Sequence, residues 1–152
     1  MKLSEQDKRV LRLLQQDASK GKLELSELAN LSASTLWRRV RELEETGIID
    51  RTVAILNPDK VGAPVCFIVQ VNMKNHHAKT LLEFDRLVQK SPEITECYSM
   101  TGSFDYMLIV RTSTVASFEE FLMKQVLTNT SVANASSSVS LHRTKYTTEI
   151  QV

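Results

Sequence analysis

The chain has 152 residues, a formal net charge of +1 and a hydrophobic content of 42%. That length allows one ordinary domain or two small ones, and the composition is that of a globular protein. The apolar runs are too short to span a membrane and the N-terminus has no signal-peptide core, so we expect a cytoplasmic protein without a membrane partner. Cys66 and Cys97 lie far apart, whereas a disulfide framework or a metal site needs more ligands at closer spacing, so we expect no metal and no cofactor.

The first predicted helix follows Ser4, whose hydroxyl is a suitable N-terminal cap. Apolar residues recur after it at the spacing of one helical face, and Gly21 is expected to end the helix. These apolar residues are Val10, Leu11, Leu13 and Leu14. A second, shorter helix should bury Leu25 and Leu28 on one face.

The third predicted helix spans residues 33–46. Leu36, Val40 and Leu43 recur at i, i+4 and i+7, which turns them toward the first two helices. Ser32 can cap the start of this helix, and Gly47 can close its end. Residues 1–50 are therefore predicted to be a domain of three helices.

The segment after Gly47 changes character. Residues 48–56 are rich in Ile, Val and Leu and favour a strand or a small hairpin. Asn57, Pro58 and Gly62 are breakers of regular structure. We therefore predict a strand and hinge linker over residues 51–62, between the helical domain and a second domain.

Residues 63–152 are predicted to form a domain with the order βαββαβ. Strand-like segments alternate with two segments whose apolar residues recur at helical spacing. In chain order these segments are PVCFIVQVNM, AKTLLEFDRLVQK, ITECYSM, DYMLIVRT, VASFEEFLMKQVL and NASSSVSLHRTKYTTEI. The order suggests a ferredoxin-like sheet with both helices on one face, which makes the whole chain an α+β protein.

The first of these strands is apolar on both faces at its start. Since both helices are expected on one face of the sheet, the other face needs a separate cover. A second copy of the same sheet is the simplest cover, and we therefore expect a homodimer.

Residues 22–43 carry the spacing of a helix-turn-helix motif. Ser26 is small where the two helices must approach closely, and Asn30 tolerates the left-handed conformation that the turn needs. Leu36 and Val40 anchor the second helix of the pair. We therefore predict a winged helix-turn-helix domain at the N-terminal end of the chain.

The outward face of the third helix combines small hydroxyl residues with arginine. When its apolar residues face inward, steps of 100° per residue place Ser34, Arg38 and Arg41 outward, with flanking residues on either side. Arginine can bind a guanine edge or a phosphate, and hydroxyl residues let a helix approach the major groove closely. The predicted DNA-binding residues are Ser34, Thr35, Trp37, Arg38, Arg39 and Arg41.

A solvated basic face is the plainer alternative, because the net charge of the chain does not favour nucleic acid. Between Glu27 and Glu42, however, the only charged residues are arginines, and a compact patch can contact phosphates without a basic domain. Trp37 also has two alternative roles: packing against a neighbouring helix or wing, or contact with the DNA backbone or a sugar.

The segment TGSFDYMLIV, residues 101–110, joins two predicted strands and contains the spacing G-x-x-D-Y. Taken by itself, this spacing indicates a hairpin in which Gly102 supplies a positive φ and Asp105 bonds back to the turn.

The whole chain resembles the Lrp/AsnC family of transcriptional regulators. The segments that carry the resemblance are DKRVLRLLQQDA, LSELANLSASTLWRRVRELEETGII, LNPDKVG, SPEITECYSMTGSFDYMLIV and KYTTEI. The resemblance implies an N-terminal domain that binds double-stranded DNA and a C-terminal βαββαβ domain that dimerises. It also implies that dimers assemble further, commonly to an octamer, and that a small effector, often an amino acid, binds between dimers.

The resemblance further implies an effector site at Gly102, Asp105, Ser136 and Ser138. The Asp105 carboxylate could accept hydrogen bonds from an ammonium group, while amides near Gly102 and the serine hydroxyls could hold a carboxylate. The predicted function is therefore that of a sequence-specific DNA-binding transcriptional regulator that responds to an amino acid or a related small metabolite.

The sequence supports an enzyme less well than a transcriptional regulator. His76, His77 and His142 form no catalytic set with a nucleophile at any spacing that can be argued from the sequence, so we expect no enzyme. Sirohaem decarboxylases resemble the same two-domain architecture and remain one alternative. An oligomeric sensor that does not bind DNA is the other.

Overall fold

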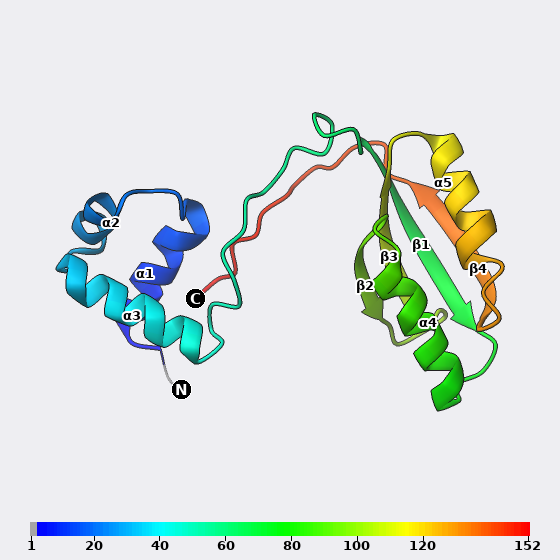
Figure 1. Cartoon of the computed structure of the whole chain (residues 1–152), viewed down its shortest axis with the longest axis horizontal. Coiled ribbons are helices and arrows are strands. Elements are labelled where there is room, and N and C mark those ends of the chain that lie inside the picture. The colour runs from blue at the N-terminus through cyan, green and yellow to red at the C-terminus, as the bar shows by residue number, and fades with distance from the viewer. Residues whose placement is uncertain (1–2) are drawn as a thin grey trace. The chain divides into compact units, whose positions relative to one another are not determined.

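The computed structural model describes residues 3–152 and divides the chain into two units (Figure 1). The first unit extends to Ile55 and also contains Thr144–Val152, and the second unit is Leu56–Arg143. The chain therefore passes from one unit to the other twice. Within residues 3–152, no helix is both long enough and apolar enough to cross a membrane.

The first unit begins with helix α1, Glu5–Gln16. The Ser4 hydroxyl accepts a hydrogen bond from the Asp7 amide, and the Asp7 carboxylate accepts from the Ser4 amide, which confirms Ser4 as the cap. The helix ends at Gln16, so the prediction that Gly21 ends it is wrong. Asp17 adopts an extended conformation and accepts hydrogen bonds from Ser19, which turns the chain before Gly21 is reached.

The helix-turn-helix consists of α2, Lys22–Ala29, and α3, Ala33–Glu45. Asn30 lies between them with φ 56° and ψ 48°, and it is the one non-glycine residue with positive φ among residues 3–152. Ser32 caps α3 by accepting a hydrogen bond from the Thr35 amide at 3.2 Å. Gly47 follows α3 with φ 70°, as expected of a residue that closes a helix. The predicted turn and both predicted ends of α3 are confirmed.

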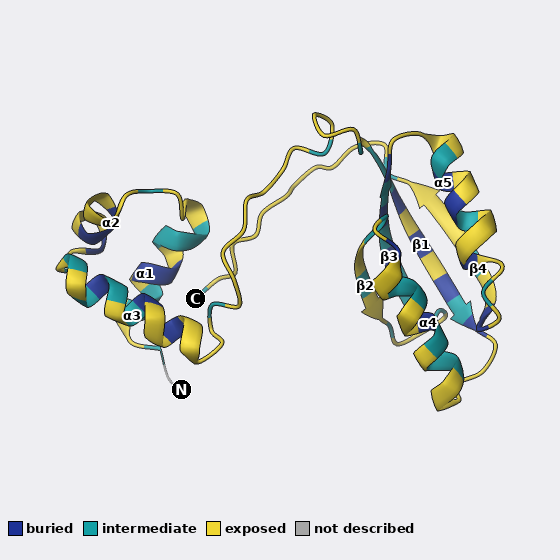
Figure 2. Ribbon diagram, viewed as in Figure 1, coloured by how far each residue is buried: buried dark blue, intermediate teal, exposed yellow. Residues whose placement is uncertain are grey.

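The three helices enclose one apolar core, visible as the buried faces in Figure 2. The prediction that Leu28 is internal is wrong, because Ala29, one turn after Leu25, takes the inner position and leaves Leu28 exposed. Ser26 is buried and its hydroxyl donates to the Leu23 carbonyl oxygen, which satisfies it where the helices meet. The buried apolar residues are Val10, Leu11, Leu25, Ala29, Leu36, Val40 and Leu43.

The strand or hairpin predicted over residues 48–56 is absent, since residues 50–57 have no regular secondary structure. Val53 and Ile55 are exposed, so their β-propensity has no sheet to pack against. The tail of the chain, Thr144–Val152, belongs to this unit although the sequence suggested that it continues the second domain. Gln15 of α1 exchanges hydrogen bonds with the Ile150 backbone, and Val152 packs on the helical core.

The second unit is a four-stranded antiparallel sheet in the order β2-β3-β1-β4. Its helices α4 and α5 lie on one face of the sheet (Figure 1), which confirms the ferredoxin-like prediction. In chain order its elements are β1, Val65–Met73; α4, Ala78–Lys90; β2, Ile94–Ser99; β3, Tyr106–Thr112; α5, Val115–Phe121, which continues as a π-helix over Leu122–Val126; and β4, Val132–Val139.

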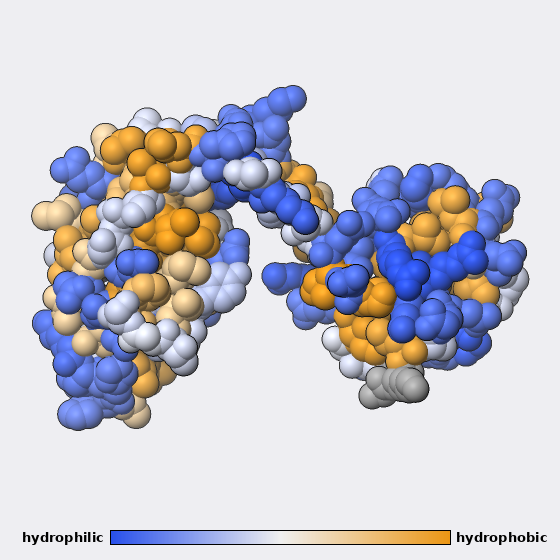
Figure 3. All heavy atoms as spheres, turned by 180° about the vertical axis from the view of Figure 1, so that it is seen from behind, coloured by the Kyte–Doolittle hydropathy of each residue, from blue (hydrophilic) through white to orange (hydrophobic). Residues whose placement is uncertain are grey.

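Strand β1 alternates along its length between buried and exposed residues (Figure 2). Phe67, Val69 and Val71 point into the core under the helices, whereas Ile68 remains 37% exposed. Figure 3 views the molecule from the opposite side and shows apolar side chains gathered among hydrophilic ones on this unit. The sheet face without helices therefore presents apolar side chains to solvent in a single chain.

Candidate functional sites

The outward face of α3 matches the helical spacing. Ser34, Arg38 and Arg41 are exposed, and Thr35 is half-buried with its hydroxyl 2.8 Å from the hydroxyl of Ser32. The buried residues Leu36, Val40 and Leu43 fix the rotation of the helix, so Arg38 and Arg41 project away from the core. This arrangement leaves a convex basic surface with small residues at the N-terminal end of the helix.

The exposed arginines pair with acids of their own helix. Arg38 lies 2.6 Å from a Glu42 carboxylate oxygen, and Arg41 lies 3.8 Å from Glu45. Exposed pairs at i, i+4 contribute little stability, so a phosphate or a base edge can replace them. The i, i+4 spacing of these pairs is visible in the sequence, although it was not used to predict them.

Arg39 faces another way. Its guanidinium donates to the Asp7 carboxylate at 2.8 Å and to the Gln6 side-chain carbonyl oxygen at 2.6 Å, both on the α1 side of the unit. The Arg39 side chain is 21% exposed, compared with 61% for Arg38. Burial alone would raise the pKa of the Asp7 carboxyl, but hydrogen bonds from Ser4 and the Arg39 guanidinium together hold it below its ordinary value. Arg39 thus links α3 to α1.

Trp37 is half-buried and packs against the helical core. The Lys22 ammonium lies 5.0 Å from the centre of its ring, a cation–π contact that no spacing in the sequence indicated. The indole Nε1 is buried and has no hydrogen-bond partner among residues 3–152. Beside the ring is a hollow of about 400 Å³, whose lining residues are Lys22, Trp37, Arg38, Arg41 and Glu44.

The loop between β2 and β3 carries the G-x-x-D spacing. Gly102 has φ 126°, a conformation that favours glycine, and it is exposed. The Asp105 carboxylate accepts a hydrogen bond from the Met73 amide at 2.7 Å and contacts the His76 Nε2 atom at 2.7 Å. The Met73 amide and, to a lesser extent, His76 hold the pKa of the Asp105 carboxyl below its ordinary value. His76 is a neighbour of Asp105 that the sequence did not reveal.

Ser136 and Ser138 lie on β4, where they pair in register with Gln70 and Ile68 of β1. Both serines are exposed. Strand β1 separates β4 from β3, and the Asp105 amide donates to the Val71 carbonyl oxygen on the β3 side of β1, so two strand spacings of about 10 Å in total separate Asp105 from β4, and the serines lie further along that strand. A single chain therefore keeps the predicted effector residues in two groups on opposite sides of β1.

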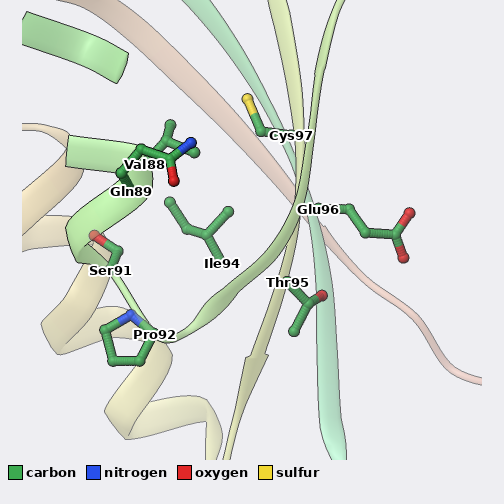
Figure 4. Close-up of a pocket in the computed structure, with 8 residues that line it drawn as sticks. All are labelled: Val88, Gln89, Ser91, Pro92, Ile94, Thr95, Glu96 and Cys97. Atoms are coloured by element: carbon green, nitrogen blue, oxygen red, sulfur yellow. The ribbon is translucent and has the colours of Figure 1, made fainter. Parts of the chain in front are cut away.

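A second hollow, of about 380 Å³, lies between the end of α4 and β2 (Figure 4). Its charged residue, Glu96, points away from it across the strand, while Ile94 points toward the helix. Cys97 lines it as a free thiol whose pKa burial raises, which makes the reactive thiolate scarcer. Within residues 3–152, no group of three His, Cys, Asp or Glu side chains is placed to hold a metal ion. None of the residues described as lining this hollow points a charged group into it to orient a ligand.

Comparison with known proteins supports a regulator. Residues 66–150 match the family model described as the Lrp/AsnC ligand binding domain, and residues 3–50 match a winged helix-turn-helix DNA-binding model. The chain is 33% identical to the glutamate uptake regulatory protein of Zymomonas mobilis, over 97% of this chain and 89% of that protein. It is 30% identical to the DNA-binding transcriptional activator DecR of Escherichia coli strain K12, over 96% of each chain.

A solved structure is also similar over nearly the whole chain. It is the complex of a transcriptional regulator from Neisseria meningitidis with L-methionine. The TM-score is 0.94 and the sequence identity 30%, and the match covers 98% of this chain and 96% of that one.

Proposed function

The chain belongs to the Lrp/AsnC family of transcriptional regulators, and we propose that it binds operator DNA through the outward face of α3 under the control of an amino acid. The observation that carries the DNA-binding half is the direction of Ser34, Arg38 and Arg41, which project from a helix set by the Asn30 turn. As a transcriptional regulator it has no catalytic role to assign, and it acts in the cytoplasm, where the DNA lies.

On DNA, the N-terminal end of α3 enters the major groove. Arg38 and Arg41 leave Glu42 and Glu45 and contact guanine edges or phosphates, while Ser34 and Thr35 permit a close approach. Trp37 and Lys22 line the hollow beside them and suit a backbone phosphate. Arg39 is held by Asp7 of α1 and orients α3 from its inner side, without contacting DNA.

A dimer presents two copies of α3 to neighbouring major grooves. The open sheet face, with Ile68 partly exposed, suits contact with a second copy. Such a dimer reads two half-sites separated by one helical turn of DNA or a multiple of it, in a pseudo-palindrome. Further assembly to an octamer brings the loops of one dimer against another.

The proposed effector is an amino acid. The related Neisseria meningitidis regulator was solved as a complex with L-methionine. In this chain Asp105 supplies an acceptor for the ammonium group, and the loop amides near Gly102 and the hydroxyls of Ser136 and Ser138 supply donors for the carboxylate. Because β1 separates these two groups in one chain, the complete site takes residues from more than one subunit.

Selection from random-sequence DNA tests the proposal. Purified protein should enrich duplexes that contain a pseudo-palindrome, and fluorescence anisotropy should give at least roughly a thousandfold preference for the enriched site over scrambled DNA at physiological salt. Equal affinity for the enriched site and for scrambled DNA would overturn the proposal that α3 recognises a specific sequence. A thermal-shift screen of the twenty amino acids then tests the effector, since a ligand of the native state raises the melting temperature.

A further inference from the structure

We infer that His76 is an internal competitor of the effector, because its imidazole occupies the position on Asp105 that the effector's ammonium group would take. This inference rests on the proposed effector role of Asp105. It adds a residue that lies outside the G-x-x-D spacing, and that residue sets the effector concentration to which the protein responds.

The two carboxylate oxygens of Asp105 have different kinds of partner. Oδ2 accepts from the backbone amide of Met73, at the end of β1, and this donor cannot leave without disrupting the strand end. Oδ1 contacts the His76 side chain, which is 69% exposed, while Asp105 itself is 27% exposed. One oxygen is therefore fixed, and the other is held by a group that can rotate into solvent.

The turn that carries His76 is anchored on both sides. The Lys74 amide donates to the Ser131 carbonyl oxygen at 2.9 Å, and the Asn75 side chain accepts from the His77 amide and from the Thr80 hydroxyl. Because the backbone is held, displacement of His76 requires only rotation of its side chain. The exchange can therefore occur without unfolding the loop.

The chemistry of the exchange favours an ammonium ligand. A neutral hydroxyl or amide donor gains little over the imidazole that it displaces, whereas a charged donor forms a stronger bond to a carboxylate. Asp105 is the charged group against this imidazole.

Isothermal titration with L-methionine tests the inference on the full chain, and the remaining amino acids follow if L-methionine does not bind. His76→Ala should bind the amino acid roughly three- to tenfold more tightly than the unmodified protein. His77→Ala removes the neighbouring imidazole, which has no bond to Asp105, and should leave the affinity unchanged.

The outcomes separate this inference from the proposed function. If the unmodified protein and His76→Ala bind an amino acid equally well, the competition is overturned and the effector function stands. If neither binds any of the twenty amino acids, the effector function falls and the inference with it. Without effector, carbon-13 NMR should show the pKa of Asp105 rising in His76→Ala but not in His77→Ala; no rise would overturn the contact itself.

Discussion

At the scale of single residues, adjacent arginines of α3 have opposite surroundings. Arg38 projects outward beside Glu42, whereas Arg39 turns back to Asp7 of α1. The direction of Arg38 could be predicted from the sequence, because the apolar residues fix the inner face. The partner of Arg39 could not, because it lies 32 positions away and no local spacing specifies it.

Substitution of these arginines should separate binding from stability. Arg38→Ala should weaken binding to the selected operator by about 1–3 kcal/mol, because the proposed bidentate contact to a base would be lost, and should leave the melting temperature nearly unchanged. Arg39→Ala should lower the free energy of unfolding by about 1–2 kcal/mol, because it leaves Asp7 without its charged partner. Anisotropy and thermal melts measure both. An Arg38→Ala protein with full affinity at physiological salt removes Arg38 from the interface.

Asp7 should make the stability of the helical unit depend on pH. Its pKa is lower in the folded chain than the ordinary value, which describes the unfolded chain. Its contribution is therefore fully present above that ordinary value and is lost as pH falls through the folded pKa. Urea unfolding between pH 6 and pH 2 should show a smaller loss of stability in Asp7→Asn. Asp50→Asn, at an exposed carboxylate, is the control; equal pH dependence in all three proteins would contradict the assignment.

At the scale of elements, local sequence patterns predicted the helices and the sheet. They did not predict the contacts between residues far apart in the chain. Caps and apolar spacing mark α1 and α3 because those signals lie within the elements themselves. The prediction of a strand or hairpin over residues 48–56 is wrong because β-propensity does not supply a partner strand. The return of the tail to α1 joins residues 135 positions apart, and the Asp105–His76 contact joins residues 29 apart.

The tail contact can be tested through Gln15. Its side-chain amide donates a hydrogen bond to the Ile150 carbonyl oxygen, and its side-chain oxygen accepts one from the Ile150 amide. Gln15→Ala should lower the free energy of unfolding by about 1 kcal/mol, because both bonds are lost at an exposed position. Gln16→Ala changes the exposed neighbour and serves as the control. Equal stability of the two variants would show that the tail does not support the helical unit.

At the scale of the whole molecule, the proposed assembly depends on the sheet face that carries no helix. Ile68 lies in its middle, paired in register with Ile109 on one side and Ser138 on the other. Contact with a second copy would remove these apolar side chains from water, and within residues 3–152 the single chain has no element that covers them.

Ile68→Glu should therefore convert a dimer to a monomer, because it would bury a charge without a partner in the interface. Sedimentation velocity measures the change, and circular dichroism should show that the fold is kept. Leu82→Glu places the same charge at an exposed apolar position on α4, away from the open face, and should leave the dimer intact. A dimeric Ile68→Glu protein would require another contact surface.

The double passage of the chain between its units has a consequence for exchanging sensors among regulators of this kind. Since the helical unit is completed by Thr144–Val152, the sheet unit is an insertion within it and not an appendage after it. If two regulators are joined at a single point near Ile55, the hybrid keeps the helices of one protein. The segment that corresponds to Thr144–Val152 then comes from the other protein. Hybrids with two joints, one on each side of Leu56–Arg143, transfer the sensor and leave every contact of the recipient's helices in place.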